Sequence, residues 1–313
     1  MNLSLQDFLQ IDLPALMAAT LACIACALVG NFLVLRRQAL LGDAISHAVL
    51  PGIVLGFMVS GSRDILPMLG GALAAALVAG VLIEAVRRVG RLEPGAAMGV
   101  VFTVLFALGV VLIEQSAARA VDLDVDCVLY GQLEDILWLA PTGWGSLLDP
   151  AVWAEVPREV ATLAAVTVLV AGLMAAFYKE LKITTFDPAL ASALGIRAGV
   201  FHYALVLVTA VVTIAAFEAV GSILVVAMLI APAATARLLT DRLAVQLGLS
   251  VVFGAVSGLG GYALAVSAPL WLGVPASLNA AGMIAVMAGL LLTLAILFSP
   301  HRAAARQVVA PGP

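Results

Sequence analysis

Residues 14–35 read PALMAATLACIACALVGNFLVL, a stretch that holds no charged side chain. A helix needs about 20 mainly apolar residues to cross about 30 Å of hydrocarbon. Similar stretches recur along the chain, separated by charged residues and by Pro or Gly. The predicted fold class is therefore all-α, a polytopic transmembrane helix bundle. Nine spans are predicted, at residues 14–35, 45–60, 65–86, 96–114, 158–178, 199–217, 220–239, 243–266 and 279–298.

The composition supports lipid as the solvent for most of the chain. Of its 313 residues, 64% are hydrophobic and 11% are charged, whereas soluble domains carry about 25% charged residues. The spans leave no room for a second soluble domain, so residues 1–313 are predicted to form one membrane domain. The second span is short, and eight crossings result if one stretch only re-enters the membrane. A net charge of −4 argues against a nucleic-acid partner.

The basic residues predict the orientation. Cytoplasmic loops of membrane proteins are enriched in Lys and Arg. An external N-terminus places only Arg63, Arg119 and Arg158 outside, and the other 12 of the 15 Lys and Arg inside. The tail from about residue 299 is then cytoplasmic.

The predicted outer side is acidic, and residues 122–126 place three carboxylates at alternate positions. This segment resembles the start of an EF-hand, but Cys127 stands where the loop needs Gly, and Leu133 where it needs Glu. A calcium loop is therefore excluded. The segment is interpreted either as an outer vestibule for cations or as a solvated loop, and its carboxylates are those of Asp122, Asp124 and Asp126.

Pairs of glycines four residues apart predict close helix packing, because small residues let helices approach where lipid provides no hydrophobic drive. The pairs are Gly52 with Gly56, Gly95 with Gly99, and Gly254 with Gly258. Cys23 and Cys26 form a C-x-x-C, but they lie inside an apolar span, where small thiols usually pack.

Residues 41–52, LGDAISHAVLPG, hold the best candidate for chemistry. In a helix Asp43 and His47 lie four apart and therefore share a face. A carboxylate oxygen and an imidazole nitrogen so placed suit manganese, iron or zinc. Ser46 would hold a ring nitrogen or a water beside the ion. The alternative is a hydrogen-bonded Asp–His pair that fixes the helix geometry.

A second carboxylate, Glu218, lies near the predicted outer end of the sixth span, beside Gly221 and Ser222. Ionisable groups at membrane depth are functional candidates, because burying them is expensive. Glu218 is interpreted as a gate or a further metal ligand, or as a helix-end carboxylate in the membrane interface.

The basic side carries a short segment with helix-end signals. Asp187 is a suitable N-cap, Pro188 suits the first helical position, and Gly195 suits the exit. The predicted helix either lies along the membrane or inserts into a cytoplasmic partner.

Several motifs are absent from the full sequence. It has no G-x-x-x-x-G-K-[ST] for nucleotide and no H-E-x-x-H of a metalloprotease. A G-x-S-x-G nucleophile elbow is also missing. The chain is therefore predicted to be a transport subunit rather than an enzyme, with ATP hydrolysis on a partner.

Four stretches together resemble the permease subunit of the manganese/zinc/iron class of bacterial ABC importers. They are residues 41–52, residues 126–131 (DCVLYG), residues 186–196 (FDPALASALGI) and residues 218–232 (EAVGSILVVAMLIAP). They run through most of the chain in the family's order. The likeness is specific to the family and not to one metal.

This resemblance implies a multi-pass protein of the bacterial inner membrane that transports Mn²⁺, Zn²⁺ or Fe²⁺ as substrate and holds no permanent cofactor. It implies a second permease subunit, identical or related, two cytoplasmic ATP-binding subunits and an external metal-binding protein. Asp43 and His47 map onto the family's metal site. The helix with Asp187, Pro188, Ala191, Leu194 and Gly195 maps onto the coupling helix that seats in the ATPase.

Two other classes of function stay open on the residues alone. A proton-coupled secondary transporter would use Asp43 and His47 as a proton relay and would need no ATPase. An intramembrane metal-dependent enzyme would turn over a substrate without transport. An importer of a metal chelate is a variant that needs a wider cavity.

Overall fold

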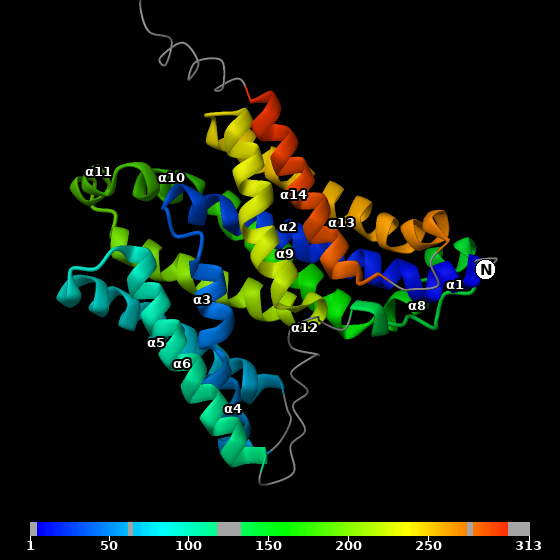
Figure 1. Ribbon diagram of the computed structural model, residues 1–313, viewed down its shortest axis with the longest axis horizontal. Helices are drawn as coiled ribbons and strands as arrows, with labels where there is room; N and C mark the ends of the chain where they lie inside the picture. Colours follow the sequence, from blue (N-terminus) through cyan, green and yellow to red (C-terminus); the bar gives the residue numbers. More distant parts are fainter. Residues whose placement is uncertain (1–4, 62–64, 118–132, 274–277, 300–313) are drawn as a thin grey trace, which may run out of the picture.

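The computed structural model describes residues 5–61, 65–117, 133–273 and 278–299, and every regular element in these ranges is helical. The helices form a bundle in which α3 to α6 make one side and α2, α9 and α12 to α14 the other (Figure 1). The long helices are α2 (Leu13–Leu35), α5 (Ile65–Gly90), α6 (Pro94–Ala117), α9 (Arg158–Ala176), α12 (Ala198–Leu239), α13 (Leu243–Leu272) and α14 (Ala280–Phe298). The shorter ones are α1 (Leu5–Asp7), η1 (Phe8–Asp12), α3 (Leu41–Ala48), α4 (Leu50–Ser60), η2 (Leu133–Asp135), η3 (Trp144–Leu148), α8 (Pro150–Ala154), α10 (Tyr178–Phe186) and α11 (Pro188–Ala193).

The predicted membrane spans are present as helices. Within the described residues, eight helical segments are long and apolar enough to cross a membrane. The remaining predicted span corresponds to α5, a continuous helix of 26 residues that packs against α4 and α6. Large apolar side chains on the outer faces, such as Val104, Val168 and Val252, are more than half exposed. Such faces fit a lipid environment. The prediction of an all-α polytopic bundle is confirmed.

The sixth and seventh predicted spans are the two halves of α12. They meet at Gly221, whose φ of 76° and ψ of 169° lie outside the helical region. A residue with a side chain would be strained there, because this conformation is reached almost only by glycine. The predicted division into two spans is therefore present, with the kink at Gly221 just inside the predicted start of the seventh span at 220.

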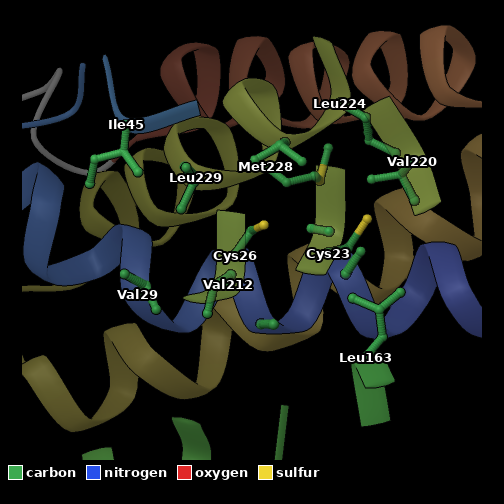
Figure 2. Close-up of a cluster of buried hydrophobic side chains, with 14 of the residues drawn as sticks. Cys23, Cys26, Val29, Ile45, Leu163, Val212, Val220, Leu224, Met228 and Leu229 are labelled. Atoms are coloured by element: carbon green, nitrogen blue, oxygen red, sulfur yellow. The ribbon is translucent and has the colours of Figure 1, made fainter. Parts of the chain in front are cut away.

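Helix α2 is the centre of the bundle. It packs against α12, α13 and α9, and most of its side chains are buried. In Figure 2, Cys23 and Cys26 point into a cluster with Val220, Leu224 and Met228 of α12. Both cysteines are free and buried, as predicted for thiols that pack.

One polar network is buried inside this apolar core. The Asn31 side-chain amide of α2 donates to the hydroxyl of Ser250 at 2.6 Å, and it accepts from the Gln246 amide at 3.0 Å. All three side chains are at most 1% exposed. Interhelical hydrogen bonds of this kind contribute about 0.6 to 1.7 kcal/mol in membrane proteins. The network therefore sets the register of α2 against α13.

The predicted glycine packing is confirmed for two of the three pairs. An added Cβ at Gly52 would lie 2.2 Å from the carbonyl oxygen of Gly71 on α5, and Gly254 and Gly258 approach the backbone of α2. Gly95 and Gly99 are different, because a Cβ at either would meet no atom of the described residues within 4 Å. The sequence spacing marks a small-residue face, but it does not say whether another helix of the same chain covers it.

Gly30 on α2 provides a test of the central packing. An added Cβ would lie 2.0 Å from the Leu229 carbonyl oxygen, so Gly30→Ala must separate α2 from α12. We expect a loss of about 1 to 3 kcal/mol of stability, as is usual for overpacking. Thermal unfolding of the purified protein in detergent measures it. Gly248→Ala is the control, because its Cβ would meet no atom of the described residues within 4 Å. An equal Tm for both variants would contradict this account of the core.

The two ends of the bundle differ. Arg36, Arg87 and Arg237 follow or end α2, α5 and α12 at one end, called here the basic end. At the other end, the segment after residue 133 is pinned to several helices. The Glu134 carboxylate accepts from the amide of Ala280 at 3.1 Å, and the amide of buried Trp138 donates to the Gln10 carbonyl at 2.9 Å. These bonds tie a loop segment to the starts of α14 and α2.

Candidate metal site on a broken helix

The second predicted span is a broken helix. It starts at Leu41, four residues before the predicted start at 45, and is interrupted at Val49 between α3 and α4. Pro51 is the local cause. Proline has no N–H, so the carbonyl four residues earlier, that of His47, lacks its usual helical donor. Discontinuous helices of this kind carry the ion sites of many membrane transporters.

Asp43 and His47 lie on one face of α3, as predicted. The Nε2 atom of His47 is 3.4 Å from the Oδ1 atom of Asp43. That separation exceeds the usual 2.7–3.2 Å of an N–H···O hydrogen bond. An ion about 2.1 Å from both atoms would see them at an angle of about 108°, close to tetrahedral. The pair is therefore spaced as two ligands of one ion.

The imidazole of His47 is held between α3 and α6. Its ring centroid is 5.9 Å from that of Phe102 and 5.3 Å from that of Phe106, with the Phe106 ring nearly perpendicular. These contacts restrict the ring and leave its nitrogen edge toward Asp43. No sequence pattern predicts this aromatic wall, because Phe102 and Phe106 look like ordinary members of an apolar span.

The described residues place two candidate ligands, and no more, at this position. The side chain of His47 is 28% exposed and that of Asp43 is 31% exposed. Across residues 5–61, 65–117, 133–273 and 278–299, no group of three or more His, Cys, Asp or Glu side chains could hold a metal. Two protein ligands are fewer than a closed structural metal site uses. The remaining ligands of a bound ion would be water, groups of this chain outside the described residues, or groups of another chain.

Other predicted site residues are described only in part. The backbone of Ser46 lies in α3 and that of Glu218 in α12, three residues before the kink at Gly221, but the described structure does not extend to either side chain. The predicted outer carboxylates lie outside the described residues, and they are Asp122, Asp124 and Asp126. The second of the four resemblance stretches, residues 126–131, lies there as well.

The short helix at the basic end has the predicted caps. The Asp187 carboxylate accepts from the amide of Leu190 at 2.9 Å, and Pro188 occupies the first turn. Gly195 ends the segment with a φ of 81°, which favours glycine. Ala191 is fully buried, whereas the side chains of Leu190 and Leu194 are 48% and 63% exposed. Helix α11 therefore presents an apolar surface away from the rest of the chain.

A model of the ABC 3 transport family matches residues 8–138 and 152–299. The chain belongs to this family. It is 43% identical over 278 residues to the manganese transport system membrane protein MntD of Bacillus subtilis, with 88% of each protein covered. It is 37% identical over 295 residues to the zinc transport system membrane protein TroD of Treponema pallidum, with 94% of this chain and 76% of that protein covered.

A solved structure shares the fold. The structure of PsaBC from Streptococcus pneumoniae in complex with Fab matches with a TM-score of 0.72 at 30% identity, over 92% of this chain and 91% of that one. The resemblance to permeases of the divalent-metal class of ABC importers is therefore confirmed. Together with the eight candidate spans, it makes the chain a multi-pass protein of the bacterial inner membrane.

Proposed function

We propose that this chain is the membrane permease of an ATP-driven importer of a divalent transition metal. The observation that carries the proposal is the Asp43–His47 pair, 3.4 Å apart on the broken second span of an ABC 3 family member. One oxygen and one nitrogen ligand suit manganese, zinc and iron. Relatives named for manganese and for zinc transport support the same metal class.

The pair suits a transport site better than a storage site. An ion in transit must bind well enough to enter and weakly enough to leave. Two ligands that remain about one-third exposed meet that condition, whereas a closed cage would retain the metal. We infer that a second permease subunit, identical or related, faces the exposed side of the pair and completes the pathway. Glu218 is proposed as a gate or a transient ligand on the approach to this site.

The partners follow from the same proposal. The sequence carries no nucleotide-binding motif, so two cytoplasmic ATP-binding subunits would hydrolyse ATP. Helix α11, with Leu190 and Leu194 exposed, is proposed to seat in them. The basic end would then be cytoplasmic and the N-terminus external. An external solute-binding protein would deliver the metal, which the acidic outer segment at residues 122–126 would help to attract.

Uptake measurements test this function. The chain is produced in cells with its ATP-binding subunit and solute-binding protein, and uptake of labelled manganese, zinc and iron is recorded. We expect saturable uptake that is lost when the ATP-binding subunit is omitted, and the preferred ion identifies the substrate. Uptake that persists without that subunit and stops when the proton gradient is dissipated would overturn the proposal in favour of proton coupling. Turnover of another substrate without metal uptake would indicate an enzyme.

A further inference from the structure

The turn that joins α2 to α3 is short and tightly hydrogen-bonded. The amide of Gln38 donates to the Leu33 carbonyl at 2.8 Å, and the amide of Leu41 donates to the Gln38 carbonyl at 2.9 Å. Arg37 has a φ of 57°, in the left-handed region that residues with side chains rarely adopt. A backbone held in this way has few soft torsions. A displacement of Arg36 is therefore passed to the start of α3.

The side chain of Arg36 crosses from this turn to α10. Its Nε donates to the hydroxyl of Thr185 at 3.1 Å, and its Nη2 donates to the hydroxyl of Thr184 at 3.1 Å. Thr184 is buried and donates in turn to the Glu180 carbonyl at 2.7 Å. The planar guanidinium thus donates hydrogen bonds to two successive residues of α10.

Arg36 is partly buried, which strengthens its hydrogen bonds to the two threonines. Removal from water lowers the pKa of the Arg36 guanidinium, although the group stays charged at neutral pH. A charge placed there keeps its hydrogen bonds because solvent cannot replace them fully. The hydrogen bonds from Arg36 to Thr184 and Thr185, called here the bridge, are therefore expected to persist more than those of an exposed arginine on the surface.

Helix α10 leads directly into α11. Phe186 ends α10 and Asp187 caps α11, so no loop separates the two helices. A continuous path of hydrogen-bonded and helical elements thus runs from α11 through α10 and Arg36 to α3, where Asp43 and His47 lie. In Figure 1, α10 passes beside the end of α2 from which this turn begins. Helix α12 also packs against α10, α11 and α3, and it therefore provides a second connection between them.

We propose that Arg36 is a positioning residue that passes movement of α10 and α11 to the metal-site helix α3. This inference rests on the proposed function, because it requires that an ATPase moves α11 and that α3 holds the metal. Arg36 takes no part in metal binding itself. Its loss frees α3 from α10, so that ATP is still hydrolysed but fewer ions are moved for each ATP.

The test uses the complete transporter in proteoliposomes, with its ATP-binding and solute-binding subunits. ATP hydrolysis and uptake of labelled manganese and zinc are recorded together, and binding of Mn²⁺ alone to the complex is measured by equilibrium dialysis. For Arg36→Ala we expect about a tenfold rise in ATP hydrolysed per ion transported. Metal affinity stays within about twofold, because the two ligands are intact.

A second variant approaches the bridge from its other side. The double variant Thr184→Val/Thr185→Val removes both acceptors and keeps the side-chain shapes. It tests the same interaction if the transporter with Arg36→Ala fails to assemble. We expect the same uncoupling, and no additional effect when it is combined with Arg36→Ala, because both remove one interaction. Arg91→Gly is the control. It removes an exposed arginine from the turn between α5 and α6, where its φ of 49° suits glycine.

The outcomes separate this inference from the proposed function. An unchanged ratio of ATP to metal in both bridge variants would overturn it. A loss of Mn²⁺ affinity that matches the loss of uptake would also overturn it, since Arg36 would then only shape the site. Absence of uptake by the assembled wild-type transporter would instead contradict the proposed function.

Discussion

Replacing His47 with alanine is expected to reduce metal uptake by the assembled transporter about a hundredfold. In the proposed site the imidazole is a metal ligand together with Asp43, and its Nε2 lies 3.4 Å from the Asp43 carboxylate. A single remaining carboxylate holds a divalent ion poorly against water. Uptake of labelled manganese and zinc, measured at matched membrane levels of the permease, gives the result. Asp43→Asn should act similarly, because it removes the anionic oxygen and keeps the size of the side chain.

The control for this experiment is another histidine. His301→Ala changes a residue that the proposed pathway does not use, and we expect it to transport like the wild type. Assembly with the ATP-binding subunit should be equal in all variants, because α3 lies apart from α11. Undiminished uptake by His47→Ala would exclude the Asp43–His47 site while leaving the family assignment intact.

Introducing aspartate at Leu190 and Leu194 together is expected to abolish assembly with the ATP-binding subunits, and with it metal uptake. Leu190 on α11 and Leu194 directly after it are 48% and 63% exposed, so the chain should fold without either leucine. If α11 seats in an ATP-binding subunit as proposed, both side chains would be removed from water there. Two carboxylates placed there lose their hydration without gaining partners, which is costly. Co-purification of the ATP-binding subunit with tagged permease measures the loss.

The matched control is the same substitution at the other end of the bundle. Leu148 on η3 is 87% exposed, and Leu148→Asp should leave co-purification unchanged. Normal assembly of the Leu190→Asp/Leu194→Asp variant would mean that α11 does not seat in the ATPase. The Arg36 inference would then lose its source of movement as well.

The spans could be predicted from the sequence because lipid imposes one simple condition. Each must be mainly apolar, so α2, predicted at 14–35, is found at Leu13–Leu35. The second span was predicted too short because residues 41–44, which include Asp43, were left out of it. The structure begins at Leu41 and includes the polar residues of α3. Gly221 is visible in the sequence as a possible break between two apolar stretches. The structure gives it backbone angles that residues with side chains rarely adopt.

The part of the candidate site that could be predicted is the part formed by residues close together in the sequence. Asp43 and His47 share a face because four residues make about one helical turn, and that spacing is visible in the sequence. The wall of Phe102 and Phe106 and the bridge from Arg36 to Thr184 join segments far apart in the chain. Contacts between distant segments leave no repeating pattern in the sequence, so they could not be predicted from a single sequence.

The central place of α2 has a consequence for how the protein is made. Asn31 bonds to Gln246, which lies 215 positions later in the chain. At a synthesis rate of about 5–20 residues per second, the ribosome needs about 10–40 s to produce that partner. During this interval the Asn31 amide can donate to the Ala27 carbonyl of its own helix, 2.7 Å away, but its side-chain oxygen has no bond from Gln246 and the face of α2 that packs against α12 is uncovered. Helix α2 is thus made before most of the helices that cover it, and it reaches its full set of contacts only after α12 and α13 have been synthesised.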